Sequence, residues 1–195
     1  MSRYRGPRIK VIKRLGELPG FTNKPFISKK TLKAEKAIIQ GSQYSIRLQT
    51  KQKLRYHYGI TEKKLIQYVQ KAKKAKKSTG KILLQLLEMR LDNILYRANI
   101  TTTIASARQL VNHGHIYINN KKIDIPSYSC KPGCKISFSD KLSKLNQIGS
   151  QKSQIPSHLF LNKDNSTIMV QNYLSDNEAG LKLNKLFVIE YYSRS

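Results

Sequence analysis

The sequence predicts an α+β protein in which a basic helical region precedes a smaller region of short strands. Apolar residues recur at helical spacing through residues 42–58, 62–77, 81–97 and 104–112. Apolar and polar residues then alternate over residues 115–118, and further short apolar runs follow. The 195 residues include 37 Lys and Arg against 11 Asp and Glu, and the 39% of hydrophobic residues suffice for a packed core.

The positive charge is concentrated in the first half of the chain. Residues 1–90 carry 24 Lys and Arg with 4 Asp and Glu, whereas residues 91–195 carry 13 and 7. A compact protein with this excess repels itself unless a polyanion neutralises it, and nucleic acid is the first candidate. An anionic membrane surface is the weaker one, because the chain has no Trp and five scattered Phe. We expect no membrane span and no secretory signal in residues 1–20.

Residues 1–41 are expected to form an extended basic segment. Gly6-Pro7, Pro19-Gly20 and Pro25 interrupt any helical pattern, and basic residues recur every few positions. Such a segment has little apolar surface to bury, so it would become ordered against a partner. Two interpretations of this segment remain: a solvated tail, or an extension that runs along the phosphates of a nucleic acid.

Residues 42–89 predict a basic helical domain. Ser42 can cap a helix that stops before Gly59, and Thr61 can cap a second helix that continues to Lys77. Lys73 and Lys77 would lie one turn apart, and such like-charged pairs cost a few tenths of a kcal/mol each. Contact with phosphate explains this lysine run better than a solvated face does. The helical domain offers two sets of candidate cations: Arg47, Lys51 and Arg55 in one stripe, and Lys73, Lys74 and Lys77 in the run.

The stretch from residue 81 to residue 97 is apolar on almost every side, which predicts one long buried helix between two domains. Residues Thr101 to Thr103 can then cap a helix that stops at Gly114, and Asn119-Asn120 suits the turn of a β-hairpin. This helix and hairpin would combine Arg108, Gln109, His115, Tyr117, Lys121 and Lys122 on one surface. Arg binds phosphate and stacks on bases, and Tyr and His stack on unpaired bases, so the surface suits RNA.

The remaining chain gives weaker signals. Residues 140–148 predict a short helix, and residues 159–161, 168–170 and 187–191 predict short strands. Cys130 and Cys134 are too few for a structural zinc site, which takes four ligands. Two reduced thiols at a turn are the first interpretation, and a regulatory disulfide or metal is the alternative. The sequence predicts no cofactor and no metal.

Several long motifs resemble one family. MRLDNILYR, ARQLVNHGHIYIN and KKIDIPSY are similar to the RNA-binding module of the small-subunit ribosomal protein S4 family. RYRGP, KQKLRYHYGI and VIEYYSR match the same family in order, so the resemblance runs from Ser2 to Arg194. MSRYRGPRIK, RLGELPG, LLQLLEMRLDNILYR and SYSCKPG resemble its plastid (chloroplast) branch. The N-terminal segment lacks the cysteines of zinc-binding bacterial members, and the stretch from Phe160 to Leu183 matches poorly.

The resemblance implies a constituent of the small ribosomal subunit that binds the 5′ domain of 16S-type rRNA and nucleates assembly. It also implies contacts with ribosomal protein S5 and other small-subunit proteins, a place on the path along which mRNA enters, and a role in translational accuracy. The implied domains are an extended segment (1–41), a helical rRNA-binding domain (42–89, completed by 178–195), an inserted S4-type module (90–152), and a linker with short strands (153–177).

Residue by residue, the resemblance implies rRNA contacts at matching positions. Arg90 and Asp92 could instead form an internal ion pair, and His113 and His115 could be merely exposed polar residues. The implied positions are Arg3, Arg5 and Arg8 in the segment, Arg47, Lys51, Lys53 and Arg55 in the helical domain, and Arg90, Arg97, Arg108, His113 and Lys121 in the module.

An enzymatic function is not expected. Arg90-Leu91-Asp92 resembles the motif around the catalytic Asp of some pseudouridine synthases, but Asp92 lies in an apolar helix pattern and no second large domain remains. No phosphate-binding Gly-rich loop, HExxH or nucleophile elbow is present in the sequence. The alternative to a ribosomal constituent is a free-standing RNA chaperone or RNA-modification factor.

Overall fold

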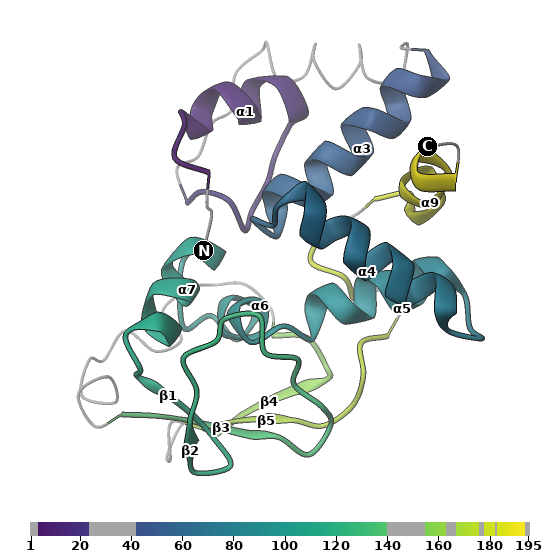
Figure 1. The fold of residues 1–195 in the computed structure, drawn as a ribbon. Helices are drawn as coiled ribbons and strands as arrows, with labels where there is room; N and C mark the ends of the chain where they lie inside the picture. Colours follow the sequence, from purple (N-terminus) through teal and green to yellow (C-terminus); the bar gives the residue numbers. More distant parts are fainter. Residues whose placement is uncertain are drawn as a thin grey trace. The chain divides into compact units, whose positions relative to one another are not determined.

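The computed structural model describes residues 4–23, 42–139, 155–162, 167–175, 178–181 and 183–193 (Figure 1). The chain forms two compact units. One comprises Met1–Leu84 with Leu181–Ser195, and the other comprises Gln85–Gly180. The second unit is therefore inserted between two segments of the first, and the predicted α+β class with an inserted module is confirmed.

Helices α3 (Gln43–His57) and α4 (Glu62–Lys74) form the basic part of the first unit. The predicted cap of α3 is confirmed, because Ser42 Oγ accepts a hydrogen bond from Ser45 N at 3.3 Å. Helix α4 begins after Thr61 as predicted but ends earlier, at an extended Ala75. The predicted one-turn spacing of Lys73 and Lys77 is wrong. Helix α4 ends at Lys74, so Lys77 lies in the connection between α4 and α5 (Thr79–Glu88).

Helix α1 (Arg8–Leu15) corrects the prediction that residues 1–41 are entirely extended. Gly6-Pro7 precedes this helix instead of interrupting it, and Pro is well tolerated at a helix start. Val11, Ile12 and Leu15 share one face and are buried together with Leu18, Phe21 and Leu181. This small core gives residues 4–23 apolar contacts within the chain itself. Residues 24–41 lie outside the described residues.

Helix α9 (Lys185–Ser193) replaces the strand predicted at residues 187–191, so that prediction is wrong. A short apolar run does not distinguish a strand from a buried helical segment. The helix packs against α3 and α4, where Val188 is buried and Glu190 forms an ion pair with Arg47.

The long helix predicted over residues 81–97 is also wrong, because the chain is extended at Arg90 between α5 and α6 (Leu91–Arg97). A neighbouring segment supplies the hydrogen bonds at this break. Leu91 N donates to Tyr128 O at 2.9 Å, and Cys130 N donates to Met89 O at 2.9 Å. The apolar pattern runs through the break because both helices are buried.

A five-stranded antiparallel sheet of order β2-β1-β3-β5-β4 forms one layer of the second unit. The predicted hairpin turn is confirmed: Asn119 and Asn120 have φ of 48° and 65°, which is the left-handed region such a turn requires. Strands β4 and β5 continue the sheet by pairing β5 with β3. The strands are β1 (Ile116–Ile118), β2 (Lys121–Lys122), β3 (Lys135–Phe138), β4 (Leu159–Asn162) and β5 (Thr167–Val170).

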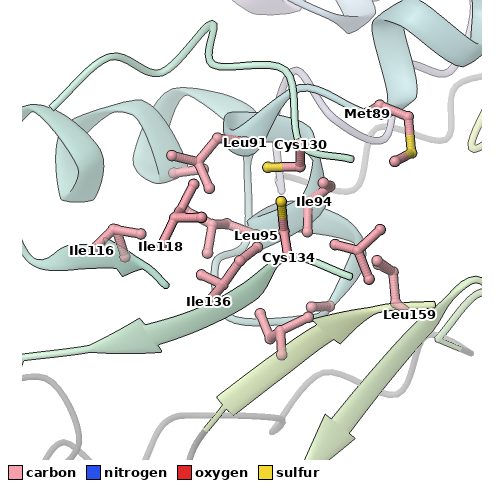
Figure 2. Packing of buried hydrophobic residues seen from close by; sticks show 14 of the residues in the cluster. Met89, Leu91, Ile94, Leu95, Ile116, Ile118, Cys130, Cys134, Ile136 and Leu159 are labelled. Atoms are coloured by element: carbon pink, nitrogen blue, oxygen red, sulfur yellow. The ribbon is translucent and has the colours of Figure 1, made fainter. Parts of the chain in front are cut away.

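The core of the second unit lies between this sheet and the pair α6 and α7 (Ile104–Asn112) (Figure 2). Leu91, Ile94 and Leu95 from α6 meet Ile116 and Ile136 from the sheet, and all five are fully buried. The predicted cap of α7 is confirmed, since Thr103 Oγ1 accepts from Ser106 N at 3.2 Å. The helix predicted at residues 140–148 lies outside the described residues.

Candidate nucleic-acid interface

Five side chains of the first unit form what we call the aromatic ladder: Tyr4, Arg8, Phe21, Arg55 and Tyr56. The ring of Tyr4 lies edge-on to Tyr56, with centroids 5.3 Å apart, and 5.9 Å from Phe21. Arg8 Cζ lies 5.5 Å from the Phe21 ring centroid, and Arg55 Cζ lies 4.6 Å from that of Tyr56. The three rings therefore contact one another, and a guanidinium group lies over each of two of them, Phe21 and Tyr56.

The aromatic ladder suits a nucleotide. Tyr4 is 41% exposed, so a base can reach its ring, and the guanidinium groups of Arg8 and Arg55 can receive phosphate or stack. Arg8 Nη1 also donates to Phe21 O at 3.1 Å, which orients that side chain. Sequence reasoning selected both arginines but missed the three rings, because their partners lie far apart along the chain.

Two cations of the predicted helical stripe are engaged inside the first unit. Arg47 Nε lies 2.6 Å from Glu190 Oε2, and Lys51 Nζ lies 3.0 Å from Glu62 Oε1. Only 6% of the Lys51 side chain is exposed, and its ammonium lies 4.3 Å from the ring centroid of Tyr191. Lys51 therefore stabilises the junction of α3, α4 and α9 and does not belong to an exposed RNA surface.

Glu62 joins a second residue to this junction. Tyr192 OH donates to the same Oε1 atom at 2.5 Å, and burial together with this carboxylate raises the pKa of Tyr192. Lys73 Nζ donates to Tyr192 O at 3.1 Å. The C-terminal motif thus helps to hold α9 in place, which the family resemblance alone did not predict.

Arg90 and Arg108 share one buried carboxylate in the second unit. Asp92 Oδ1 and Oδ2 lie 3.0 and 2.7 Å from Nε and Nη2 of Arg90, and Oδ2 also lies 2.7 Å from Arg108 Nε. Asp92 is fully buried and Arg90 nearly so. Of the two interpretations of Arg90 and Asp92, the structure confirms the internal ion pair.

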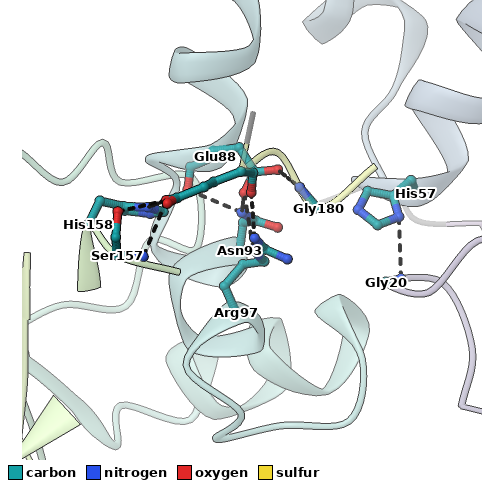
Figure 3. Close-up of polar contacts among 9 residues, drawn as sticks. Gly20, His57, Glu88, Asn93, Arg97, Ser157, His158 and Gly180 are labelled. Carbon is teal, nitrogen blue, oxygen red and sulfur yellow. Dashed lines mark hydrogen bonds and ion pairs between the residues drawn. The ribbon is translucent and has the colours of Figure 1, made fainter. Parts of the chain in front are cut away.

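Arg97 belongs to a polar network around the buried Glu88 (Figure 3). Glu88 accepts hydrogen bonds from Asn93 Nδ2 at 2.6 Å and Gly180 N at 3.0 Å, and its Oε2 lies 3.8 Å from Arg97 Nε. Arg97 Nη2 donates to Glu178 O at 2.6 Å. The network connects the end of α5 to the residues just before the chain returns to the first unit.

The end of α7 and the β1–β2 hairpin meet in one exposed surface. Gly114 has a φ of 73°, and a Cβ there would collide with the side chain of Lys122, so the lysine lies directly against the end of the helix. His113 is exposed, and its ring lies 6.2 Å from that of His115, whose Nδ1 is 3.2 Å from Ser139 Oγ. Gln109 and Lys121 are also exposed.

The remaining predicted cations are distributed over the first unit. Arg5, Lys74 and Lys77 are exposed, and Lys53 is half-buried. Arg3 lies outside the described residues. The structure thus brings Arg8 and Arg55 together, leaves Lys74 and Lys77 on the surface, and holds Lys51 and Arg90 inside.

The two cysteines are buried free thiols within the core of the second unit (Figure 2). Burial, with contributions from Cys134 and Asp92, raises the pKa of Cys130 to about 12. Among the residues that the structure describes, no three His, Cys, Asp or Glu side chains are grouped to hold a metal ion. The helices within the described ranges include none with the length and apolar character needed to cross a membrane.

Comparison with known proteins identifies the family. Residues 3–88 match the family described as "Ribosomal protein S4/S9 N-terminal domain", and residues 89–136 match the "S4 domain". Proteins named "Small ribosomal subunit protein uS4c" from Chaetosphaeridium globosum and Physcomitrium patens are each 51% identical to this chain, over all of it and 99% of their own length. The chain belongs to the ribosomal protein S4 family. A protein of the same name from Hypopterygium didictyon is 52% identical, again over the whole chain and 99% of its own length.

Within the S4 family framework, the two matched regions meet between residues 88 and 89, directly before the break at Arg90. The S4 domain match covers α6, α7, β1 and β2 and ends inside β3. Strands β4 and β5 lie beyond the match yet belong to the same sheet. The predicted membership of the S4 family is confirmed.

Proposed function

We propose that the chain is a structural constituent of the small ribosomal subunit that binds 16S-type rRNA. One observation carries this proposal. Most of the described carboxylates bond to groups of the chain itself, whereas many Lys and Arg side chains are exposed to solvent. Among the described residues, Glu62, Glu88, Asp92, Glu178 and Glu190 all bond to groups of the chain itself. Exposed cations include Arg5, Lys63, Lys64, Lys71, Lys74, Lys76, Lys77, Lys121 and Lys122.

This distribution leaves a surface that a polyanion can neutralise. Lys and Arg displace counterions from a nucleic-acid backbone, which supplies affinity without base specificity. The aromatic ladder and the α7–hairpin surface add groups that can stack on unpaired bases. We assign the primary contacts to the 5′ domain of the rRNA, and we propose that binding there nucleates assembly of the subunit.

Protein and mRNA contacts form the finer part of the proposal. Tyr44 and Leu186 are the most exposed large apolar side chains described in the first unit, and a protein partner would cover such groups. We assign ribosomal protein S5 to this surface, and we propose that the cationic surface also borders the path along which mRNA enters. Through S5 and mRNA, the chain would contribute to translational accuracy.

The location follows from the relatives. The chain is about half identical, over its whole length, to proteins named uS4c, the plastid form of this subunit protein. We therefore place the chain in the small subunit of the plastid (chloroplast) ribosome. A membrane is not among its proposed partners.

Binding, and not catalysis, is the proposed mechanism. Asp92 is the residue that resembled a catalytic aspartate, and its carboxylate is held by two guanidinium groups inside the core. A buried carboxylate in that state has no access to a nucleotide. The free-standing chaperone or modification factor is the alternative, and no described site favours it.

Filter binding of the full chain to the 5′ domain of small-subunit rRNA tests the proposal. We expect log affinity to fall linearly with log salt, and the Lys74→Ala/Lys77→Ala double variant to reduce the slope by roughly 0.7 to 0.9 for each phosphate that is no longer neutralised. Lys131→Ala is the control, since Lys131 is also exposed but was not assigned to RNA. Affinity no greater than for unrelated RNA of the same length would overturn the proposal.

A further inference from the structure

The sheet of the second unit has an outer face that the core does not use. Successive strand residues point to opposite sides of a sheet. Ile136 and Ile168 are opposite each other in the register and lie fully buried in the core. Their neighbours Lys135 and Met169 are also paired, and Met169 pairs in turn with Phe160 of β4. Lys135, Met169 and Phe160 therefore form a row on the side away from the core.

The same face continues across the other strands. Tyr117 of β1 pairs with Lys122 of β2 on one side and Ser137 of β3 on the other. Its neighbours Ile116 and Ile118 are buried, so Tyr117 is directed to the outer side. We call Phe160, Met169, Lys135, Tyr117 and Lys122 the outer sheet face.

The outer sheet face exposes two large apolar side chains to solvent. Phe160 is 53% exposed and Met169 45% exposed although they are adjacent cross-strand neighbours. Lys122 and Lys135 are exposed and Tyr117 is half-buried. None of the described strand residues on this side is acidic. Adjacent exposed apolar groups bordered by cations mark a binding surface, and the charge selects an anionic partner.

We propose that the outer sheet face binds an unpaired segment of RNA. Bases would stack on the rings of Phe160 and Tyr117 and contact the polarizable Met169 side chain, while phosphates lie near Lys122 and Lys135. Phe160 and Tyr117 lie three strands apart, about 14 Å at the usual interstrand spacing, so the face accommodates more than one base. A double helix would leave its bases paired and could not stack in this way.

The inference rests on the proposed function and assigns one further contact to it. The outer sheet face shares Lys122 with the α7–hairpin surface but extends to Phe160 and Met169, which come from strands outside the matched S4 domain. An acidic protein segment is the competing occupant. Such a segment would gain from Lys122 and Lys135 but would not need a ring at position 160, which makes base stacking the distinguishing property.

The test measures binding of the full chain to a 12-nucleotide single-stranded RNA by fluorescence anisotropy. An abasic oligomer of equal length and charge serves as the second probe. We expect Phe160→Ala to weaken binding of the RNA roughly tenfold and to leave the abasic oligomer unaffected, and Phe160→Trp to bind at least as well as the native chain. Ile125→Ala is the matched control, because Ile125 is also 53% exposed but lies outside the strands.

Each outcome decides the inference. Equal RNA affinities of Phe160→Ala and Ile125→Ala would overturn it, as would an equal loss toward both probes. If Phe160→Ala lowers the unfolding temperature, the comparison between Phe160→Trp and the native chain decides, and a Trp variant that binds tenfold more weakly contradicts stacking. The proposed function is tested separately, since removal of this face alone leaves binding to the folded 5′ domain measurable.

Discussion

Arg108 Nε lies 2.7 Å from Oδ2 of Asp92, a carboxylate that is completely removed from solvent. The family resemblance assigned Arg108 to RNA, yet its guanidinium group also neutralises a charge in the core. We therefore expect a substitution at this position to change stability, whether or not Arg108 also contacts RNA. Loss of RNA affinity in an Arg108 variant does not by itself identify a contact.

Asp92→Asn should destabilise the second unit. The amide removes the negative charge that Arg90 and Arg108 share, so both guanidinium groups lose their ion pair with this buried carboxylate. We expect a loss of about 3 kcal/mol in the free energy of unfolding, as when one partner of a buried ion pair is removed. Urea denaturation followed by circular dichroism measures it. Asp124→Asn, at an exposed site, is the control, and equal stability of the two variants would contradict the account.

Glu88→Gln should also be destabilising, for a different reason. The two carboxylate oxygens of Glu88 accept from two donors, Asn93 Nδ2 and Gly180 N. A glutamine keeps one acceptor and places its own NH₂ group against the other donor. We expect a cost of about 2 kcal/mol, measured by urea denaturation. Glu17→Gln, at an exposed site, should change little, and a Glu88→Gln variant as stable as this control would refute the network.

The stability of the second unit should fall as the pH is lowered below neutrality. Burial lowers the pKa of His158 below its ordinary 6.5. The positive charge of Arg97 lowers this pKa further, whereas the carboxylates of Glu88 and Glu178 partly raise it. Just below pH 6.5, His158 therefore binds a proton in the unfolded chain but not in the folded chain. Stability is lost as the pH falls below about 6.5.

His158→Gln should reduce this pH dependence. We expect the difference in unfolding free energy between about pH 7 and about pH 5.5 to be smaller for the variant than for the native chain, as measured by denaturation at both pH values. The hydrogen bonds from Ser157 lower the pKa of Glu178, but that carboxyl titrates at a lower pH and does not interfere. An unchanged difference would show that His158 is not the responsible group.

Cys130 should be inert in the folded protein. Its thiol is buried and its pKa is raised to about 12, so little thiolate forms near neutral pH. We expect a thiol reagent to modify Cys130 only in denaturant, with mass spectrometry of the labelled peptide as the measurement. Rapid modification of the native chain would favour the regulatory interpretation of the two cysteines.

Local signals in the sequence predicted several features of both units. Ser42 and Thr103 cap their helices as expected, and Asn119-Asn120 forms the expected turn, because each signal acts within four residues. The break at Arg90 could not be predicted in this way. It depends on hydrogen bonds to residues about 40 positions later, and an apolar pattern does not reveal such partners.

The candidate site was also only partly predictable from the sequence. Net charge indicated the partner class, but it did not separate exposed cations from those that the fold uses. Lys51 and Lys74 look alike in the sequence, but the fold buries Lys51 beside Glu62 and the ring of Tyr191 and leaves Lys74 exposed. Phe160 carried no signal for binding, since its exposure depends on which side of the sheet the register places it.

Co-sedimentation with the small subunit tests the central claim most directly. Plastid ribosomal subunits are centrifuged through a sucrose cushion at high salt, and the copy number of the chain is measured by quantitative mass spectrometry. A constituent held by many phosphate contacts and by its neighbours should remain at one copy for each small subunit. Release of the chain into the supernatant, with intact subunits in the pellet, would contradict the account and favour a free-standing RNA-binding factor.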